Sequence, residues 1–179
     1  PPVLYTPERR AEILAQFKAR PPGLPFDGVR SDLSEQDLSN WGWNLCHRSL
    51  YSDASIRIDQ IMASCAGQRL VVACKAEDDD RLKVAATASR DVVFDETESG
   101  LTREHEGLQW YFNEEAFGFA PAGVEVELNS CDITDGPSRL CWHLEGGGLS
   151  PGYKCGNREM SPGAEENKQH QRLIFDVPY

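Results

Sequence analysis

Long hydrophobic runs and clusters of basic residues are both missing from this sequence. No stretch approaches the roughly 18 consecutive apolar residues that a membrane-spanning helix needs, so we expect no membrane span. The 179 residues carry 29 acidic and 18 basic side chains, which gives a formal net charge of −11. Nucleic acids bind proteins through clustered Lys and Arg, so we expect no nucleic-acid partner. The hydrophobic content of 40% is too high for a disordered chain, and the length suits one folded domain.

Short motifs that mark common enzymes are missing as well. The sequence has no G-x-S-x-G of serine hydrolases, no H-E-x-x-H of zinc proteases, and only dispersed histidines. Paired carboxylates for glycosidic chemistry are abundant, and Glu114-Glu115, directly after Trp110-Tyr111-Phe112, is the most suggestive pair. In such an acidic chain, however, a carboxylate pair alone identifies no enzyme.

The cysteines are the most informative residues that are present. There are six of them, an even number, and no two lie at the C-x-x-C spacing of zinc sites or redox dithiols. Three disulfides in an oxidising compartment are the first interpretation, which predicts a secreted or extracellular protein, with a periplasmic one as the alternative. Six reduced cysteines packed as small hydrophobes in a cytosolic protein remain open. The chain begins with Pro1-Pro2 and without Met, as expected after removal of a signal peptide.

The positions of the cysteines suggest how they pair. A turn at Gly136-Pro137 lies between two of them, and the end of a predicted helix brings another close to the next strand. We therefore predict the disulfides Cys131–Cys141, Cys65–Cys74 and, by elimination, Cys46–Cys155.

The first 37 residues are predicted to form a helix followed by an extended linker. Thr6 is a good N-cap, and Pro7 suits the first helical position because its missing N–H has no partner there anyway, so a helix over 7–19 is predicted. Its apolar positions form one narrow stripe: Ile13, Leu14 and Phe17. Residues 21–37 are rich in Pro, Ser and Asp and are expected to form an extended linker. The domain prediction is therefore a helix and linker over 1–37 and a disulfide-stabilised β domain over 38–179.

The β domain is predicted from short runs of alternating or continuous apolar residues separated by turns. A short helix over 54–65 interrupts them, residues 117–123 are expected to turn, and residues 157–171 to form a surface loop. Strands are expected over 41–46, 69–75, 82–88, 91–94, 108–112, 124–128, 140–144 and 172–177. Because no βαβ alternation is present, we predict a mainly β (α+β) fold, an antiparallel β-sandwich or barrel-like domain.

One stretch, residues 131–155, gathers three cysteines, several aromatic residues and a run of three glycines. Flat aromatic faces beside polar groups suit the recognition of a glycan or protein ligand, so loops around 131–153 and 110–119 are the predicted binding surface. The candidate ligand-binding residues are Trp110, Tyr111, Trp142, His143 and Tyr153. Neighbouring side chains on a strand face opposite sides, so one of each adjacent aromatic pair is expected in the core.

Acidic residues are concentrated between Glu77 and Glu115, where twelve of them accompany four basic residues. A solvated surface is the simplest interpretation of this block. A calcium ion is the candidate cofactor, because hard cations prefer carboxylate oxygens, and Asp78 and Asp80 are its candidate ligands. The runs at 77–80 and 95–98 nevertheless lack the interleaved spacing and glycine of an EF-hand loop.

Three functional hypotheses are compatible with these features. The first is a secreted binding or adhesion module for a glycan or protein ligand, and the second is a secreted hydrolase that uses carboxylates or a metal. The third is a structural appendage of a larger extracellular protein, docked through the helix at 7–19. An enzyme requires titratable groups in a concave pocket, whereas a binding module requires an exposed recognition surface.

Overall fold

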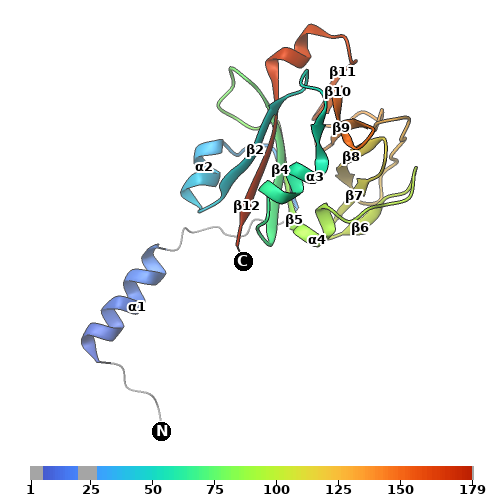
Figure 1. Ribbon diagram of the computed structural model, residues 1–179. Coiled ribbons are helices and arrows are strands. Elements are labelled where there is room, and N and C mark those ends of the chain that lie inside the picture. Colours follow the sequence, from blue (N-terminus) through green and yellow to red (C-terminus); the bar gives the residue numbers. More distant parts are fainter. Residues whose placement is uncertain (1–5, 20–27, 179) are drawn as a thin grey trace.

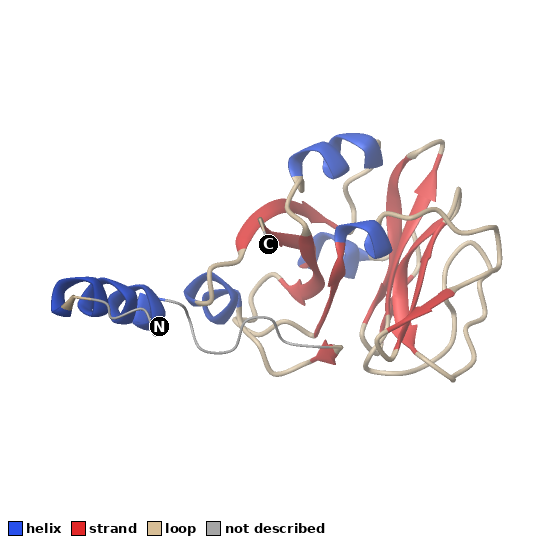
Figure 2. Ribbon diagram, turned by 90° about the horizontal axis from the view of Figure 1, so that it is seen from below, coloured by secondary structure: helices blue, strands red, loops and turns tan. Residues whose placement is uncertain are grey.

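Two antiparallel β-sheets packed face to face form the body of the protein in the computed structural model (Figure 1), which describes residues 6–19 and 28–178. Every strand pair is antiparallel, and seen from below the sheets form two layers (Figure 2). The predicted mainly β, sandwich-like fold is confirmed.

The first sheet has five strands in the order β1-β5-β4-β12-β2. Its central strands come from continuous apolar runs, as expected for strands that are buried on both faces. The bounds are β1 (Val29–Arg30), β5 (Val84–Ser89), β4 (Arg69–Ala76), β12 (His170–Val177) and β2 (Asn44–Leu50).

The second sheet has seven strands, six of them in the order β11-β10-β9-β8-β7-β6, with β3 paired to β10. The bounds are β11 (Arg158–Met160), β10 (Gly148–Cys155), β9 (Leu140–Glu145), β8 (Ala116–Pro121), β7 (Leu108–Phe112), β6 (Arg103–His105) and β3 (Ile56–Arg57).

The described helices lie outside the sheets: α1 (Pro7–Ala19), α2 (Glu35–Asn40), α3 (Ile58–Ser64), α4 (Arg90–Val93) and the 3₁₀ helix η1 (Glu165–Gln169). The predicted helix over 7–19 is confirmed, and Figure 1 draws it apart from the sheets. The side chains of its apolar stripe, Ile13, Leu14 and Phe17, lie outside the described residues. No described helix is long and apolar enough to cross a membrane.

The largest hydrophobic cluster fills the space between the sheets. Leu70 and Val72 of β4 meet the aromatic residues of the other sheet, among which Phe117 and Trp142 pack with ring centroids 5.3 Å apart. The alternation of side chains along each strand produces this arrangement, because every second residue faces the opposite sheet.

Part of the predicted 21–37 linker belongs to the folded body. Val29 and Arg30 pair with β5, and Leu33 is buried against the outer face of the five-stranded sheet. Ser34 then begins α2 with a capping box, in which its hydroxyl accepts a hydrogen bond from the Asp37 amide at 3.1 Å. From Gly28 onward this segment is therefore ordered structure; residues 20–27 lie outside the described part, and the division into two domains stays a prediction.

Several element predictions were wrong for identifiable reasons. Residues 91–94 form the short helix α4 and its C-cap, and residues 124–128 form no strand although they alternate in polarity. The predicted turn over 117–123 is mostly strand β8. Its glycine, Gly118, lies where strands approach closely, because a Cβ there would come within 2.0 Å of the Leu140 carbonyl oxygen.

Three disulfides are present and no described cysteine is free, so the predicted disulfide framework is confirmed. The pair Cys131–Cys141 is confirmed, whereas the predicted Cys65–Cys74 and Cys46–Cys155 are wrong. Cys46 of the edge strand β2 bonds Cys65 at the end of α3, and Cys74 bonds Cys155. This last bond joins the two sheets across the sandwich, a contact that sequence proximity could not reveal.

Candidate functional site

A groove of about 880 Å³ opens where loops of the seven-stranded sheet meet the start of α3. Its walls are the β7–β8 turn at 113–115, the β9–β10 turn at 146–147 and the loop at 96–99. The first two turns come from the two stretches that the sequence analysis expected to form a binding surface. The structure brings them together at one end of the sandwich.

The floor of the groove is apolar. Ile58, Phe112 and Leu144 line it, and each is at least nine-tenths buried in the body of the protein. The remaining lining is polar backbone and side chain, so the groove combines a hydrophobic base with a charged rim.

Hydrogen bonds hold the walls in place. Thr97 is hydrogen-bonded to Phe112, the last residue of β7. Its amide donates to the Phe112 carbonyl at 2.7 Å, and its hydroxyl accepts from the Phe112 amide at 3.0 Å. In the β7–β8 turn the Asn113 side-chain oxygen accepts from the amides of Glu115 and Ala116. On the other wall Arg57 donates to the Gly146 carbonyl at 2.8 Å. The groove is thus formed by constrained turns.

Four glutamates line the rim: Glu96, Glu98, Glu114 and Glu115. In the described part of the chain none of these carboxylates forms an ion pair with Lys, Arg or His. Their negative charge is therefore left for solvent ions or for a ligand. Within residues 6–19 and 28–178 no group of three or more His, Cys, Asp or Glu is placed to hold a metal ion, so the four carboxylates form an extended acidic rim.

Three of the predicted ligand-binding aromatics are core residues, and of the pair Trp110 and Tyr111, of which one was expected in the core, both are buried. Trp110, Tyr111 and Trp142 are each 1% exposed or less. The Trp142 indole donates to the Tyr51 hydroxyl at 3.0 Å, and Tyr51 donates in turn to the Lys154 carbonyl. Burial raises the pKa of the Tyr51 hydroxyl well above its usual value. These rings organise the sandwich and cannot stack on a ligand.

His143 and Tyr153 are the predicted site residues that stay partly exposed. Their rings lie edge to face with centroids 5.8 Å apart. Tyr153 packs with the small cluster on the outer face of the seven-stranded sheet, and neither residue lines the acidic groove. The expectation that one of Trp142 and His143 is core is confirmed.

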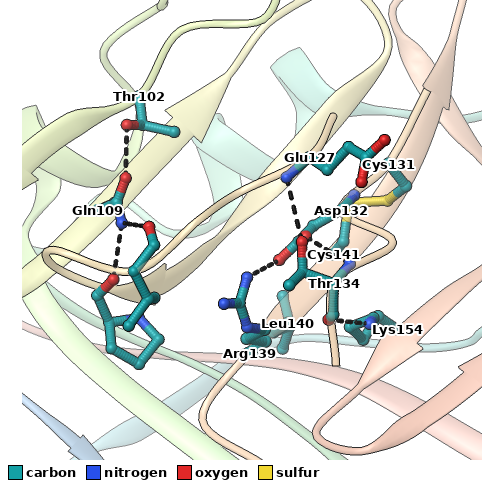
Figure 3. Close-up of polar contacts among 12 residues, drawn as sticks. Thr102, Gln109, Glu127, Cys131, Asp132, Thr134, Arg139, Leu140, Cys141 and Lys154 are labelled. Carbon is teal, nitrogen blue, oxygen red and sulfur yellow. Dashed lines mark hydrogen bonds and ion pairs between the residues drawn. A yellow bond between two sulfur atoms is a disulfide. The ribbon is translucent and has the colours of Figure 1, made fainter. Parts of the chain in front are cut away.

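The outer face of the seven-stranded sheet is covered by a segment that we call the strap, residues 122–134. Figure 3 shows the polar contacts that fasten it: Asp132 pairs with Arg139 at 2.9 Å, and the Gln109 amide donates to the carbonyls of Pro121 and Val124. Lys154 donates to the Thr134 carbonyl, and the Cys131–Cys141 disulfide ties the strap to β9. Asp132 and Arg139 are buried, so this cluster has a structural role.

A second buried polar cluster lies between the sheets. His47 and Ser49 of β2 are hydrogen-bonded at 2.9 Å, and the fully buried Arg172 donates to Ser49 and to three backbone carbonyls. Burial, followed by the charge of Arg172, lowers the pKa of His47 to about 4. This serine and histidine resemble part of a catalytic triad, but Ser49 is nearly fully buried, so the cluster belongs to the core.

The predicted calcium ligands Asp78 and Asp80 lie in the exposed turn between β4 and β5. They belong to no metal-binding group among the described residues. Their position matches the simpler interpretation of the acidic block as a solvated surface.

Comparison with protein-family models, curated proteins and solved structures finds no match to this chain. Function must therefore be argued from the groove itself. Glu114-Glu115 lies in the predicted 110–119 binding surface, but no signal in the sequence places the acidic run at 95–98 beside it. The sequence around Ile58 indicates a helix but does not indicate a groove residue. The position of Ile58 in the groove depends on the pairing of β3 with β10.

Proposed function

We propose that this protein is an extracellular binding module whose acidic groove holds a cationic segment of a protein ligand. The four rim glutamates without a cationic partner in the described chain are the observation that carries the proposal. Lys and Arg combine a charged head with an aliphatic stem, so their stems suit the apolar floor while their heads reach the rim. The three disulfides support an oxidising, extracellular setting.

An extended polycation fits this groove better than a single metal ion or a stacked sugar. The carboxylates are distributed over two walls, at 96–98 and 114–115, and form no metal-binding group among the described residues. Sugar recognition in the form predicted from sequence relied on exposed aromatic faces, and Trp110, Tyr111 and Trp142 are buried. The chain's net charge of −11 also favours the approach of a cationic partner over an anionic one.

The test is a titration of fluorescently labelled octa-arginine peptide against the wild-type protein and Glu98→Gln/Glu114→Gln. We expect the groove variant to bind about tenfold more weakly, because two carboxylates that meet the ligand are neutralised. The matched control, Asp78→Asn/Asp80→Asn, removes the same charge from an exposed turn away from the groove and should change the affinity less than about twofold. Equal weakening by both variants would show that the peptide senses only the overall charge and would overturn the proposal.

A further inference from the structure

The edges of the two sheets differ greatly in length. In the part of the chain that the structure describes, the sheets end in β1 with two residues, in β6 and β11 with three residues each, and in β2 with seven. Proteins commonly keep free edge strands short, because an unpaired edge offers its N–H and C=O groups to any other strand. The edge of β2 is the exception to that pattern here.

One side of β2 is paired with β12, and no strand of the described chain pairs with the other side. The strand pairs with β12 through six residues, from Asn44 to Leu50 with a bulge at Cys46. Among the described residues, no backbone hydrogen bond links residues 44–49 to any segment other than β12. Alternate N–H and C=O groups of an edge strand point away from its partner, so β2 presents a row of unused donors and acceptors.

A small hollow lies beside this edge. It measures about 240 Å³ and is lined by Trp43, Leu45 and Phe175 together with polar residues of α2. Leu45 is 42% exposed, one of the few large hydrophobic side chains at the surface of the described protein. An added strand would direct every second side chain toward α2, so one apolar side chain of that strand could enter the hollow.

We propose that the outer edge of β2 is a second binding surface, which accepts an extended, basic segment of a partner protein as an additional strand. Main-chain hydrogen bonds would supply much of the affinity, and the hollow beside Leu45 would select an apolar residue. A second copy of this chain is the less favourable occupant, because each copy carries a charge of −11 and two copies repel each other. The surface shares no lining residue with the acidic groove.

The probe for this surface is the acetylated, amidated heptapeptide Lys-Val-Lys-Leu-Lys-Val-Lys. We expect it to protect backbone amides within residues 44–50 from hydrogen exchange. The same peptide with N-methyl groups on alternate residues cannot form the ladder, so its affinity measured from the protection of residues 44–50 should be at least about tenfold weaker. Leu45→Thr should weaken binding of the unmodified peptide about five- to tenfold, because an apolar contact at the hollow is lost.

The controls separate this surface from the groove. Val124→Thr removes an apolar side chain of matched exposure, 43%, from the strap and should leave binding unchanged. Glu98→Gln/Glu114→Gln should leave the protection at 44–50 unchanged, so the two proposals can fail independently. Equal protection of 44–50 by the N-methylated peptide, protection confined to other segments, or a dimer of the free protein that protects 44–50 by itself would overturn the assignment of this edge to a partner segment.

Discussion

The two sheets are covered on their outer faces in different ways. The five-stranded sheet is covered by residues 28–43, which start in its edge strand β1 and then cross its outer face, where Leu33, Leu38 and Trp43 are buried in an apolar cluster. The seven-stranded sheet is covered by the strap, whose contacts include a buried ion pair, a buried lysine and a disulfide. One cover thus depends mainly on hydrophobic burial, and the other on a few specific bonds.

The difference follows from sequence. The first cover contains a regular helix, which presents an apolar side chain to the sheet, whereas the strap has no helix or strand and exposes Val124. A segment without regular structure leaves backbone groups to be satisfied individually, which Gln109 and Lys154 do here. We therefore expect the strap to be sensitive to the loss of single polar partners and the 28–43 cover to the loss of apolar volume.

The largest effect is expected from Asp132→Ala, which leaves the buried Arg139 guanidinium without its carboxylate. Removing one partner of a buried pair typically destabilises a protein by about 3–5 kcal/mol, and urea unfolding would measure the loss. The double variant Asp132→Ala/Arg139→Met should be more stable than the single variant, because no buried charge is left unpaired. A double variant less stable than Asp132→Ala would mean that Arg139 stabilises the strap by other contacts.

Leu38→Ala tests the apolar cover. Leu38 is fully buried against the five-stranded sheet, so its truncation should cost about 3 kcal/mol through lost burial and a residual cavity. The matched control is Leu128→Ala, because Leu128 lies on the strap and is only partly buried. Equal losses in thermal or urea unfolding would contradict the claim that the two covers depend on different forces.

Cys131→Ala/Cys141→Ala tests the strap's covalent bond. The disulfide closes a short loop, with a sequence separation of 10, so its removal should cost roughly 2–3 kcal/mol. Hydrogen exchange should accelerate across residues 122–134 while the amides of α2 keep their protection. Faster exchange of similar size in both covers would indicate that this disulfide stabilises the whole fold and not the strap alone.

The same contrast explains which parts of the structure could be predicted from sequence. Residues 69–75, 108–112, 140–144 and 172–177 were recognised as strands because continuous or alternating apolar residues are a local signal of burial. The 124–128 segment showed the same alternation but pairs with no strand, since pairing depends on neighbours that are distant in sequence.

The candidate site was only partly predictable for the same reason. The two stretches that form its turns were identified by their aromatic residues, yet Trp110 and Trp142 are buried and the acidic side chains beside the turns line the groove. Rim residues such as Glu98 and Glu114 lie on different loops, so their common surface exists only in the folded sheet. Cysteine pairing across the sandwich, Cys74–Cys155, required the same three-dimensional information.

The smallest effect is expected from Glu35→Gln. This substitution removes the negative charge through which α2 pairs with Lys75 and Arg48 of the five-stranded sheet. Glu35 accepts from Lys75 at 2.8 Å and pairs with Arg48; desolvation raises its pKa, but the two cations outweigh this and lower it. A carboxyl whose folded pKa is depressed contributes stability above its unfolded pKa and loses that contribution as pH falls through the folded value. Because the group is partly solvated, the variant should lose less than about 1 kcal/mol at pH 7, and the difference from wild type should shrink as pH falls through the folded pKa of Glu35. The control Glu165→Gln, in the exposed pair with Lys168, should show no measurable change over the same pH range. If Glu35→Gln instead matched Leu38→Ala in cost, the cover over residues 28–43 would depend on its ion pairs as much as the strap does, and the distinction between the two faces would fail.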